Sequence, residues 1–340
     1  MNTFSNILLL AVGFVALIKG ADFFVDGSSA LAKNFRVPGT IIGLTIVAMG
    51  TSAPELAVST SAPLKGANEI ALSNVVGSNT FNLLGVLGIC AMIKPLPIDK
   101  TILKRDFPIS IGITILTLAA VGLPLFTSGN MSDVKMSDNV GKLSRFYSAL
   151  LLVMFVSYIA MLIISAKKNS QEEESIKSEP LWKCFLLIFI GLVCVIAGGQ
   201  FVVNSAKAIA SAFGMSETLI GLTVVAIGTS LPELVTSIVA SRKGENGLAV
   251  GNVVGSNIFN ILFIMGVSGT IHPIEVNFAS LTDLAILITV SFITLIFSNK
   301  KSIGRIEGAA MVAIYIADVI FAIVMCLSSR KCIKGARKSA

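Results

Sequence analysis

Two glutamates lie inside long apolar stretches of the chain. Glu55 falls within IGLTIVAMGTSAPELAVS (42–59), and Glu233 falls within IGLTVVAIGTSLPELVTS (220–237). A carboxylate at the centre of a membrane-length helix costs about 2.5–3.5 kcal/mol on insertion scales, so such residues usually serve a function. A lone glutamate could instead belong to a structural pair, but the duplicate in a matching context favours function.

Oxygen-bearing residues accompany the first glutamate on one helical face. The positions i, i+3, i+4 and i+7 of this face are Ala48, Thr51, Ser52 and Glu55. Pro54 has no N–H, so we expect the carbonyl of Gly50 to lose its helical partner and the helix to be interrupted there. Free carbonyls, hydroxyls and a carboxylate together suit a hard cation, which takes oxygen ligands. Such a group must line a cavity, because lipid would leave its oxygens unsatisfied.

The second half of the chain repeats this arrangement. The equivalent residues are Ala226, Thr229, Ser230 and Glu233. The next apolar segment of each half adds a polar stripe at i, i+4 and i+8, formed by Asn74, Ser78 and Asn82 and by Asn252, Ser256 and Asn260. Hydroxyls in membrane helices often bond only the i−4 carbonyl, and asparagines often only hold helices together. For the threonines and serines, the face shared with a glutamate favours a ligand role.

The composition indicates a membrane protein. Hydrophobic residues make up 54% of the 340 positions and charged residues 13%, whereas a soluble domain is nearer one-quarter charged. The net charge of +7 comes from basic residues between apolar runs, which is typical of membrane loops and predicts no nucleic-acid partner. The cysteines show no CxxC spacing and His272 is the only histidine. The sequence therefore offers few ligands for a metal site built from thiolates or imidazoles.

Apolar runs of membrane length predict an all-α polytopic fold with ten transmembrane helices. Their expected ranges are 6–31, 39–62, 70–92, 106–126, 145–166, 181–203, 217–240, 248–270, 281–298 and 307–328. The stretch 127–142 is expected to be an exposed loop. The N-terminus lacks a basic region before its first apolar run, so we expect that run to remain as a membrane helix.

The two halves are related by a constant offset of 178 residues. Thirteen of 18 positions are identical between 42–59 and 220–237, and eight of nine between 74–82 and 252–260. Five segments per half would place the second half upside down, which is the inverted repeat of many secondary transporters. The expected division is a first repeat at 1–166, a polar linker at 167–180, a second repeat at 181–330 and a basic tail at 331–340.

The distribution of Lys and Arg predicts the orientation. The excess of basic residues lies in the loops after the odd-numbered segments, so these loops are expected in the cytoplasm and the N-terminus outside. The basic tail runs against this rule. We therefore expect a multi-pass protein of the cell membrane, embedded in the lipid bilayer and functional as a monomer.

Charge narrows the choice of ion. Two ionised glutamates carry −2, which one Ca²⁺ would neutralise, whereas Mg²⁺ dehydrates reluctantly. Transition metals prefer imidazole or thiolate ligands, which the proposed site lacks. Asp26 aligns with Asn204, so it forms no second acidic pair and an interfacial or structural role is favoured. The ions are thus cargo, and no cofactor is expected.

The motifs GTSAPE (50–55) and GTSLPE (228–233), each followed by GSN (77–79 and 255–257), resemble the α-repeats of the Ca²⁺/cation antiporter superfamily. The prokaryotic sodium/calcium exchangers are the most similar branch. The resemblance implies Ca²⁺ bound by Glu55 and Glu233 with the carbonyls of Thr51 and Thr229. It further implies sodium sites around this centre, drawn from Ala48, Ser52, Ser78, Ala226, Ser230 and Ser256.

The resemblance also implies a mechanism: three Na⁺ exchanged for one Ca²⁺, while the first and sixth helices slide over the core. One position departs from part of the superfamily. Asn260 occupies a site that is aspartate in potassium-dependent relatives and in some archaeal exchangers, so Asn82 and Asn260 leave the site with only two carboxylates. This argues against potassium co-transport and leaves the three-sodium stoichiometry open.

Sodium-driven Ca²⁺ antiport by alternating access is the leading hypothesis. Proton-driven Ca²⁺ antiport at the same glutamates is the first alternative, because carboxylates can carry protons. An intramembrane hydrolase is disfavoured, since an enzyme usually shows unlike acid and base residues and here the pair is duplicated without a His or Cys nucleophile. A cation channel would differ in passing current without a counter-ion.

Overall fold

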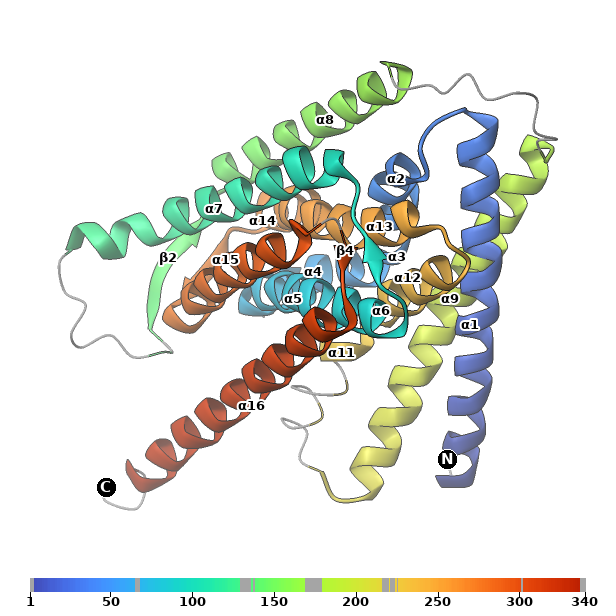
Figure 1. Ribbon diagram of the computed structural model, residues 1–340. Helices are drawn as coiled ribbons and strands as arrows, with labels where there is room; N and C mark the ends of the chain where they lie inside the picture. The colour runs from blue at the N-terminus through green and yellow to red at the C-terminus, as the bar shows by residue number, and fades with distance from the viewer. Residues whose placement is uncertain are drawn as a thin grey trace.

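The computed structural model describes residues 3–64, 68–128, 136, 138–168, 179–215, 220, 224, 226–300 and 302–336. This part of the chain is mostly helical (Figure 1). Eight of its helices are long and apolar enough to cross a membrane, or nine if the bent pair Gly39–Thr51 and Ala53–Ala62 is one span. These nine correspond to nine of the ten expected segments. The remaining one, 217–240, lies partly outside the described residues.

The first half contains five groups of helices. Their bounds are α1 Thr3–Asn34; α2 Gly39–Ile42, η1 Gly43–Val47, α3 Ala48–Thr51 and α4 Ala53–Leu64; α5 Asn68–Thr80, η2 Phe81–Val86 and α6 Leu87–Ile93; η3 Ile102–Asp106 and α7 Phe107–Ser128; and α8 Arg145–Lys168. The η segments are short π-helical stretches that join α-helical ones within a span, a feature that is frequent at functional sites.

The second half follows the same order. Its bounds are α9 Leu181–Ala212; α11 Ala226–Gly228 and α12 Leu231–Arg242; α13 Asn246–Phe259, η5 Asn260–Ile264 and α14 Met265–Ile271; α15 Phe278–Ser298; and α16 Arg305–Ala336. Because α16 continues to Ala336, the first residues of the expected tail at 331–340 are helical. Of the expected linker, 167–168 end α8 and 169–178 lie outside the described residues.

Two short antiparallel sheets add to the expected all-α fold. Strand β1 (Leu96–Pro97) pairs with β4 (Ser302–Ile303), and β2 (Asn139–Leu143) pairs with β3 (Ile274–Asn277). Each sheet therefore joins a connection of one half to a connection of the other. Part of the expected loop at 127–142 is thus a strand. Such short strands carry too little alternation to be recognised in a sequence.

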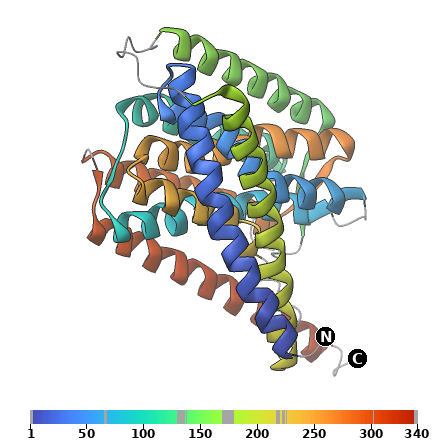
Figure 2. The ribbon, with the colours of Figure 1, turned by 90° about the vertical axis from the view of Figure 1, so that its right-hand side faces the viewer.

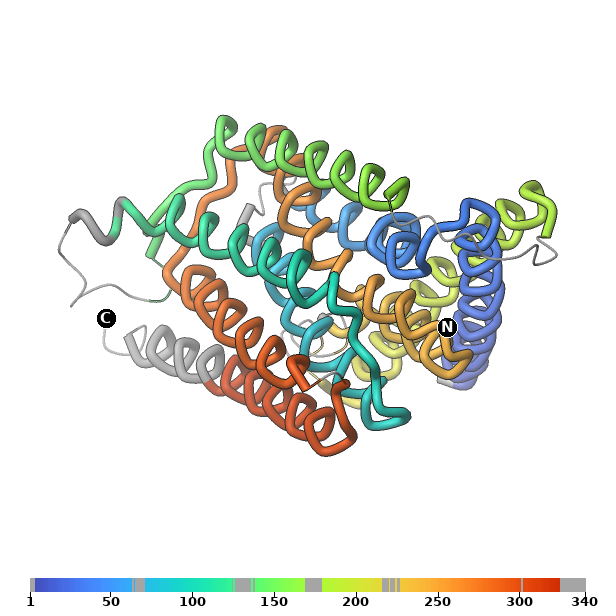
Figure 3. The backbone as a smooth tube through the Cα atoms, turned by 45° about the horizontal axis from the view of Figure 1, so that its top comes forward, coloured from blue at the N-terminus to red at the C-terminus, as the bar shows by residue number. Residues whose placement is uncertain are grey.

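Helices α1 and α9 form a close antiparallel pair at one side of the bundle (Figures 1 and 3). Figure 2 shows the pair crossing steeply over the other helices. Glycines on each helix meet the backbone of the other: a Cβ added to Gly20 would lie 2.9 Å from the Gly191 carbonyl, and one added to Gly13 would lie 3.0 Å from the Gly198 carbonyl. Small residues at this spacing let membrane helices approach closely.

The segments that carry the polar motifs form the centre of the bundle. Within the span 246–271, an apolar stretch of 18 residues is 94% buried inside the protein, whereas the corresponding stretch of the span 305–324 is 11% buried. On the outer helix α8, Val156 and Ile164 are each 66% exposed, as expected for side chains that face lipid. The polar stripes therefore face protein, and the outer helices shield them.

The helix that carries Glu55 is broken at Ser52. Ser52 leaves the helical conformation (φ −82°, ψ 11°), and the two halves of the span meet at 47°. Ser230 has nearly the same backbone angles (φ −93°, ψ 9°) in front of α12. The interruption near Pro54 is thus confirmed, but the expectation of a free Gly50 carbonyl is wrong. That carbonyl accepts a backbone N–H at the end of α3, because the chain tightens there instead of opening.

Candidate functional site

Glu55 and Glu233 occupy the first turns of α4 and α12, directly after the two breaks. Both are buried, with 0% and 1% of their surface exposed. The first turn of a helix presents unpaired N–H groups and the positive end of the helix dipole, which favours a carboxylate. The break therefore places each glutamate where its negative charge can be held inside the protein.

Hydrogen bonds from serines bring the two glutamates to one centre. Ser52 donates to Glu233 Oε1 at 2.8 Å, and Ser230 donates to Glu55 Oε1 at 3.0 Å. Ser78 also donates to Glu55 Oε1, at 3.5 Å. Each serine of a broken helix thus bonds the glutamate of the other half. The sequence placed each serine beside its own glutamate, and the exchange of partners appears only in the tertiary structure.

Several buried oxygens of the expected site residues have no hydrogen-bond partner among the described residues. They include the second carboxylate oxygens of both glutamates, and they are Glu55 Oε2, Glu233 Oε2, Asn82 Oδ1, Asn260 Oδ1 and Thr229 Oγ1. A buried acceptor without a partner is costly and rare in native proteins. A cluster of such oxygens is chemically suited to a hard cation.

The remaining expected ligands of the first half also reach this region. Thr51 Oγ1 donates to the Val47 carbonyl at 3.1 Å and lies 3.0 Å from Asn252 Oδ1. The carbonyl of Ala48 accepts a 3.4 Å hydrogen bond from Ser256. In the second half, Ala226 begins α11, but its side chain is outside the described residues.

The remaining asparagines of the polar stripes brace the glutamate helices. Asn74 donates to Ser59 Oγ and Asn252 to Ser237 Oγ, each at 2.9 Å. Both asparagines also reach backbone carbonyls of the glutamates, at 3.5 Å for Glu55 and 3.4 Å for Glu233. The interpretation of these asparagines as links between helices therefore agrees with their contacts.

The sequence did not single out the side chains of Asn79 and Asn257. These residues bond each other across the centre, and each also accepts a hydrogen bond from the last asparagine of the stripe in the other half. Their signal was present in the repeated GSN motif. They were missed because they lie one position off the stripe that runs through Ser78 and Ser256.

Other acidic residues lie apart from this centre. Lys243 pairs with Asp26 at 2.7 Å and with Asp22 at 3.3 Å, which ties α1 to the end of α12. Asp106 is held by Arg105 and by Tyr158. Within the described part of the chain, no three His, Cys, Asp or Glu side chains converge. A cation at the centre would need hydroxyl, amide and carbonyl oxygens besides the two carboxylates.

Comparison with known proteins agrees with this geometry. The family model described as sodium/calcium exchanger protein matches residues 5–164 and 183–324. The chain belongs to the sodium/calcium exchanger family. The match confirms the resemblance that the repeated motifs indicated. Membership of a transporter family also confirms that this exchanger is not an enzyme, which removes the hydrolase alternative, and that its ions are cargo, with no cofactor needed.

Individual relatives span nearly the whole exchanger. It is 37% identical over 323 residues to the putative antiporter CaxA of Alkalimonas amylolytica, covering 91% of this chain and 96% of that protein. It is 34% identical to the sodium/calcium exchanger MaX1 of Methanosarcina acetivorans, covering 93% and 97%. Among solved structures, the sodium-calcium exchanger NCX_Mj matches with a TM-score of 0.79 at 29% identity, covering 94% and 99%.

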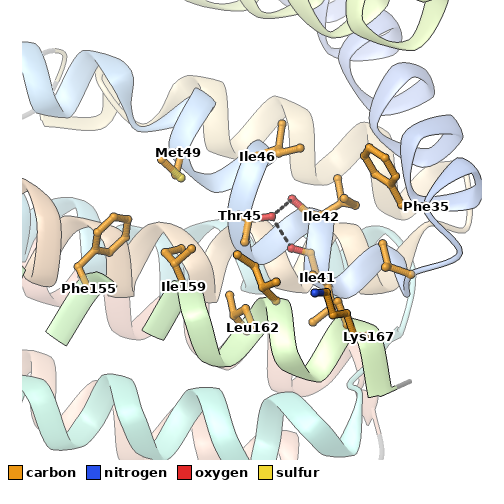
Figure 4. A pocket seen from close by; sticks show the side chains of 13 residues that line it. Phe35, Ile41, Ile42, Thr45, Ile46, Met49, Phe155, Ile159, Leu162 and Lys167 are labelled. Carbon is orange, nitrogen blue, oxygen red and sulfur yellow. Dashed lines mark hydrogen bonds between the residues drawn. The ribbon is translucent and has the colours of Figure 1, made fainter. Parts of the chain in front are cut away.

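The exchanger also has an apolar cavity of about 720 Å³ beside the broken helix (Figure 4). Residues of α2 and η1 form one wall and residues of α8 the other, with Phe155 and Ile159 across from Met49. Among the described residues that line it, Thr45 carries the one hydroxyl, and that group donates to the Ile41 carbonyl at 2.7 Å. Neither glutamate lines this cavity, so it is separate from the candidate cation site.

Proposed function

We propose that this exchanger moves Ca²⁺ and Na⁺ in opposite directions by alternating access at a site built on Glu55 and Glu233. One observation carries the proposal: each glutamate is buried, accepts a hydrogen bond from a serine of the other half, and has one oxygen without a hydrogen-bond partner among the described residues. The exchange named in the relatives MaX1 and NCX_Mj supports the choice of ions.

Calcium is proposed to bind between the two carboxylates, whose combined charge it neutralises. The carbonyls of Thr51 and Thr229 would complete its oxygen shell. Sodium is proposed to bind around the same centre at Ala48, Ser52, Ser78, Ala226, Ser230 and Ser256. Because the proposed sodium ligands Ser52 and Ser230 bond the same carboxylates that would hold Ca²⁺, the two kinds of ion would compete with each other for this centre. This competition would couple entry of one ion to release of the other.

Asn82 and Asn260 are proposed to contribute neutral amide oxygens. Both side chains are buried, and both Oδ1 atoms lack a partner among the described residues. Neutral oxygens can coordinate Na⁺ without adding charge. The absence of a third carboxylate here supports a site that does not require K⁺.

The exchanger is proposed to span the bilayer ten times as two inverted five-helix repeats, 1–166 and 181–330, joined by the linker 167–180. The constant offset of 178 residues and the antiparallel pairing of α1 with α9 support this arrangement. The N-terminus is proposed to lie outside. Asn34, at the end of α1, bonds the Glu179 carbonyl at 2.8 Å, so the first loop and the linker lie at one end. Lys33, Arg36, Lys167 and Lys168 flank this end, as expected for a cytoplasmic face.

Each repeat supplies half of the site, so one copy of the chain is proposed to be sufficient. The decisive experiment is Ca²⁺ uptake by purified protein in liposomes, with an imposed Na⁺ gradient and, separately, an imposed pH gradient. Uptake that follows the Na⁺ gradient is expected. Uptake that ignores sodium but follows pH would establish the proton-driven alternative, and current without a counter-ion would indicate a channel.

A further inference from the structure

Four buried asparagines form a ring that is closed by side-chain hydrogen bonds between two helical segments and by the backbone within each segment. The ring consists of Asn79 and Asn82 from the α5–η2 junction and of Asn257 and Asn260 from the α13–η5 junction. No more than 1% of the surface of any of the four is exposed. Asn79 aligns with Asn257, and Asn82 with Asn260, at the same offset of 178 residues as the rest of the repeat.

The ring is built from two kinds of hydrogen bond. Asn79 Nδ2 donates to the Asn257 carbonyl at 3.1 Å, and Asn257 Nδ2 donates to the Asn79 carbonyl at 3.2 Å. The side-chain oxygens of these two residues then accept from the second pair. Asn260 Nδ2 donates to Asn79 Oδ1 at 2.9 Å, and Asn82 Nδ2 donates to Asn257 Oδ1 at 3.1 Å.

This pattern permits only one orientation of each amide. A backbone carbonyl can only accept, so Asn79 and Asn257 must turn their NH₂ groups toward the carbonyls. Their oxygens must then face Asn260 and Asn82, which can respond only by donating. The amide oxygens of Asn82 and Asn260 are thereby forced away from the ring. A flipped amide at either position would place two acceptors, or two donors, against each other.

The two oxygens turned outward are the unpartnered ones. Asn82 Oδ1 and Asn260 Oδ1 are buried without a hydrogen-bond partner among the described residues, like the second oxygens of Glu55 and Glu233. Asn82 is the second residue of η2, which packs on the Glu233 helix α12. Asn260 begins η5, which packs on the Glu55 helix α4. The two residues with unpartnered oxygens therefore lie on segments that pack against the glutamate helices.

We propose that Asn79 and Asn257 are positioning residues for ion binding: they hold Asn260 and Asn82 so that each offers an oxygen, and never an NH₂ group, to the transported cation. This inference rests on the proposed function and assigns a role to two residues outside the expected ligand set. Without the two carbonyl anchors, either amide could turn and present NH₂ groups, which repel a cation. The ring therefore makes this wall of the site an acceptor-only surface.

The competing explanation is that the ring only holds the two repeats together. A double-mutant cycle separates the two roles, because residues that act through one another show non-additive effects. The variants are Asn79→Leu, Asn260→Leu and their combination. The matched control combines Asn79→Leu with Asn82→Leu, since no hydrogen bond joins these two side chains in the ring.

The measurement is the rise in unfolding temperature of the purified protein with added NaCl or CaCl₂, which reports ion binding even in a variant that does not transport. Asn79→Leu should lower the affinity for at least one ion roughly three- to tenfold, which corresponds to the net free energy of about one hydrogen bond. The combination with Asn260→Leu should bind no more weakly than Asn260→Leu alone. In the control pair, the loss of ion affinity should equal the product of the losses in the two single variants.

The positioning role would be overturned if the affinity losses of the single variants multiplied in both pairs. It would also be overturned if Asn79→Leu bound ions as the wild type does. If Asn79→Leu does not fold, the mirror-image cycle of Asn257→Leu with Asn82→Leu tests the same inference. Failure of the proposed function is a separate result, because it would appear as wild-type liposomes without sodium-dependent Ca²⁺ uptake.

Discussion

The hydroxyl of Ser52 donates to Glu233 Oε1 at 2.8 Å across 181 residues of sequence. Ser230 returns the interaction by donating to Glu55 at 3.0 Å. Each half of the chain thus supplies a carboxylate that the other half orients. A single repeat could form neither bond, which gives a physical reason for keeping both copies in one chain.

Removing the charge from either glutamate should abolish exchange. In Glu55→Gln or Glu233→Gln the shape is retained, but one of the two charges that balance Ca²⁺ is lost. Uptake of ⁴⁵Ca²⁺ into liposomes should fall to the protein-free level, while size-exclusion chromatography should show normally folded protein. Normal exchange by either variant would refute the shared site.

The crossed serine bonds predict a specific coupling. Ser52→Ala should lower Ca²⁺ affinity at least about tenfold, since a hydrogen bond to a charged group is worth about 1.5–3 kcal/mol. Calorimetric titration of the purified protein with Ca²⁺ measures this loss. Ser52→Ala should be non-additive with Glu233→Gln and more nearly additive with Glu55→Gln. The opposite pairing would show that the crossed contacts do not hold in the working exchanger.

Substituting Asn260 by aspartate tests the choice of ion. In Asn260→Asp a carboxylate oxygen would face Asn79 Oδ1, which lies 2.9 Å from Asn260 Nδ2 in the wild type. A proton on the aspartate would keep the ring closed, so the variant should resemble the wild type at low pH. As pH rises, a third negative charge should appear and the dependence on Na⁺ or K⁺ should change. Exchange rates measured at several pH values with each cation check this, and identical profiles for both proteins would contradict it.

The glycine contact between α1 and α9 should tolerate no added side chain. A Cβ on Gly20 would lie 2.7 Å from Cys194 Cβ and 2.8 Å from Val195 N. Gly20→Val should therefore destabilise the protein by about 1–3 kcal/mol or more, as overpacking does. Gly112→Ala is the matched control, because nothing lies within 4 Å of a Cβ there. Thermal unfolding in detergent should show a lower midpoint for Gly20→Val and an equal or higher one for the control.

The ion pairs between α1 and Lys243 should affect rate more than stability. Asp26 is 56% exposed on its side chain, so pairs of this kind contribute about 0–1 kcal/mol. The aligned position on α9 is Asn204, so only one end of the α1–α9 pair has this aspartate. If the pair moves against the core, Lys243→Met should speed Ca²⁺ exchange, and added salt should reduce its difference from the wild type. A rate that matches the wild type at low salt would argue against any such restraint.

Much of the molecule was predictable because its signals are local or repeated. Apolar runs of membrane length predicted all eight described spans, and a ninth if the bent pair is counted as one span, since a helix must satisfy its own backbone in lipid. The duplicated glutamates indicated the chemistry, because a carboxylate in an apolar membrane helix is energetically costly and usually serves a function. The identical spacing of GTSAPE and GTSLPE made both halves recognisable as one motif. The two short sheets escaped prediction because their partners come from opposite halves.

The sequence by itself determined which residues are present on each polar face and that every one has a counterpart 178 positions away. It could not determine their partners. Periodicity places Ser52 beside Glu55, yet the folded chain directs Ser52 to Glu233 and turns the oxygens of Asn82 and Asn260 outward through Asn257 and Asn79. Helix periodicity is a local property of the chain, whereas these contacts depend on how two distant repeats pack against each other.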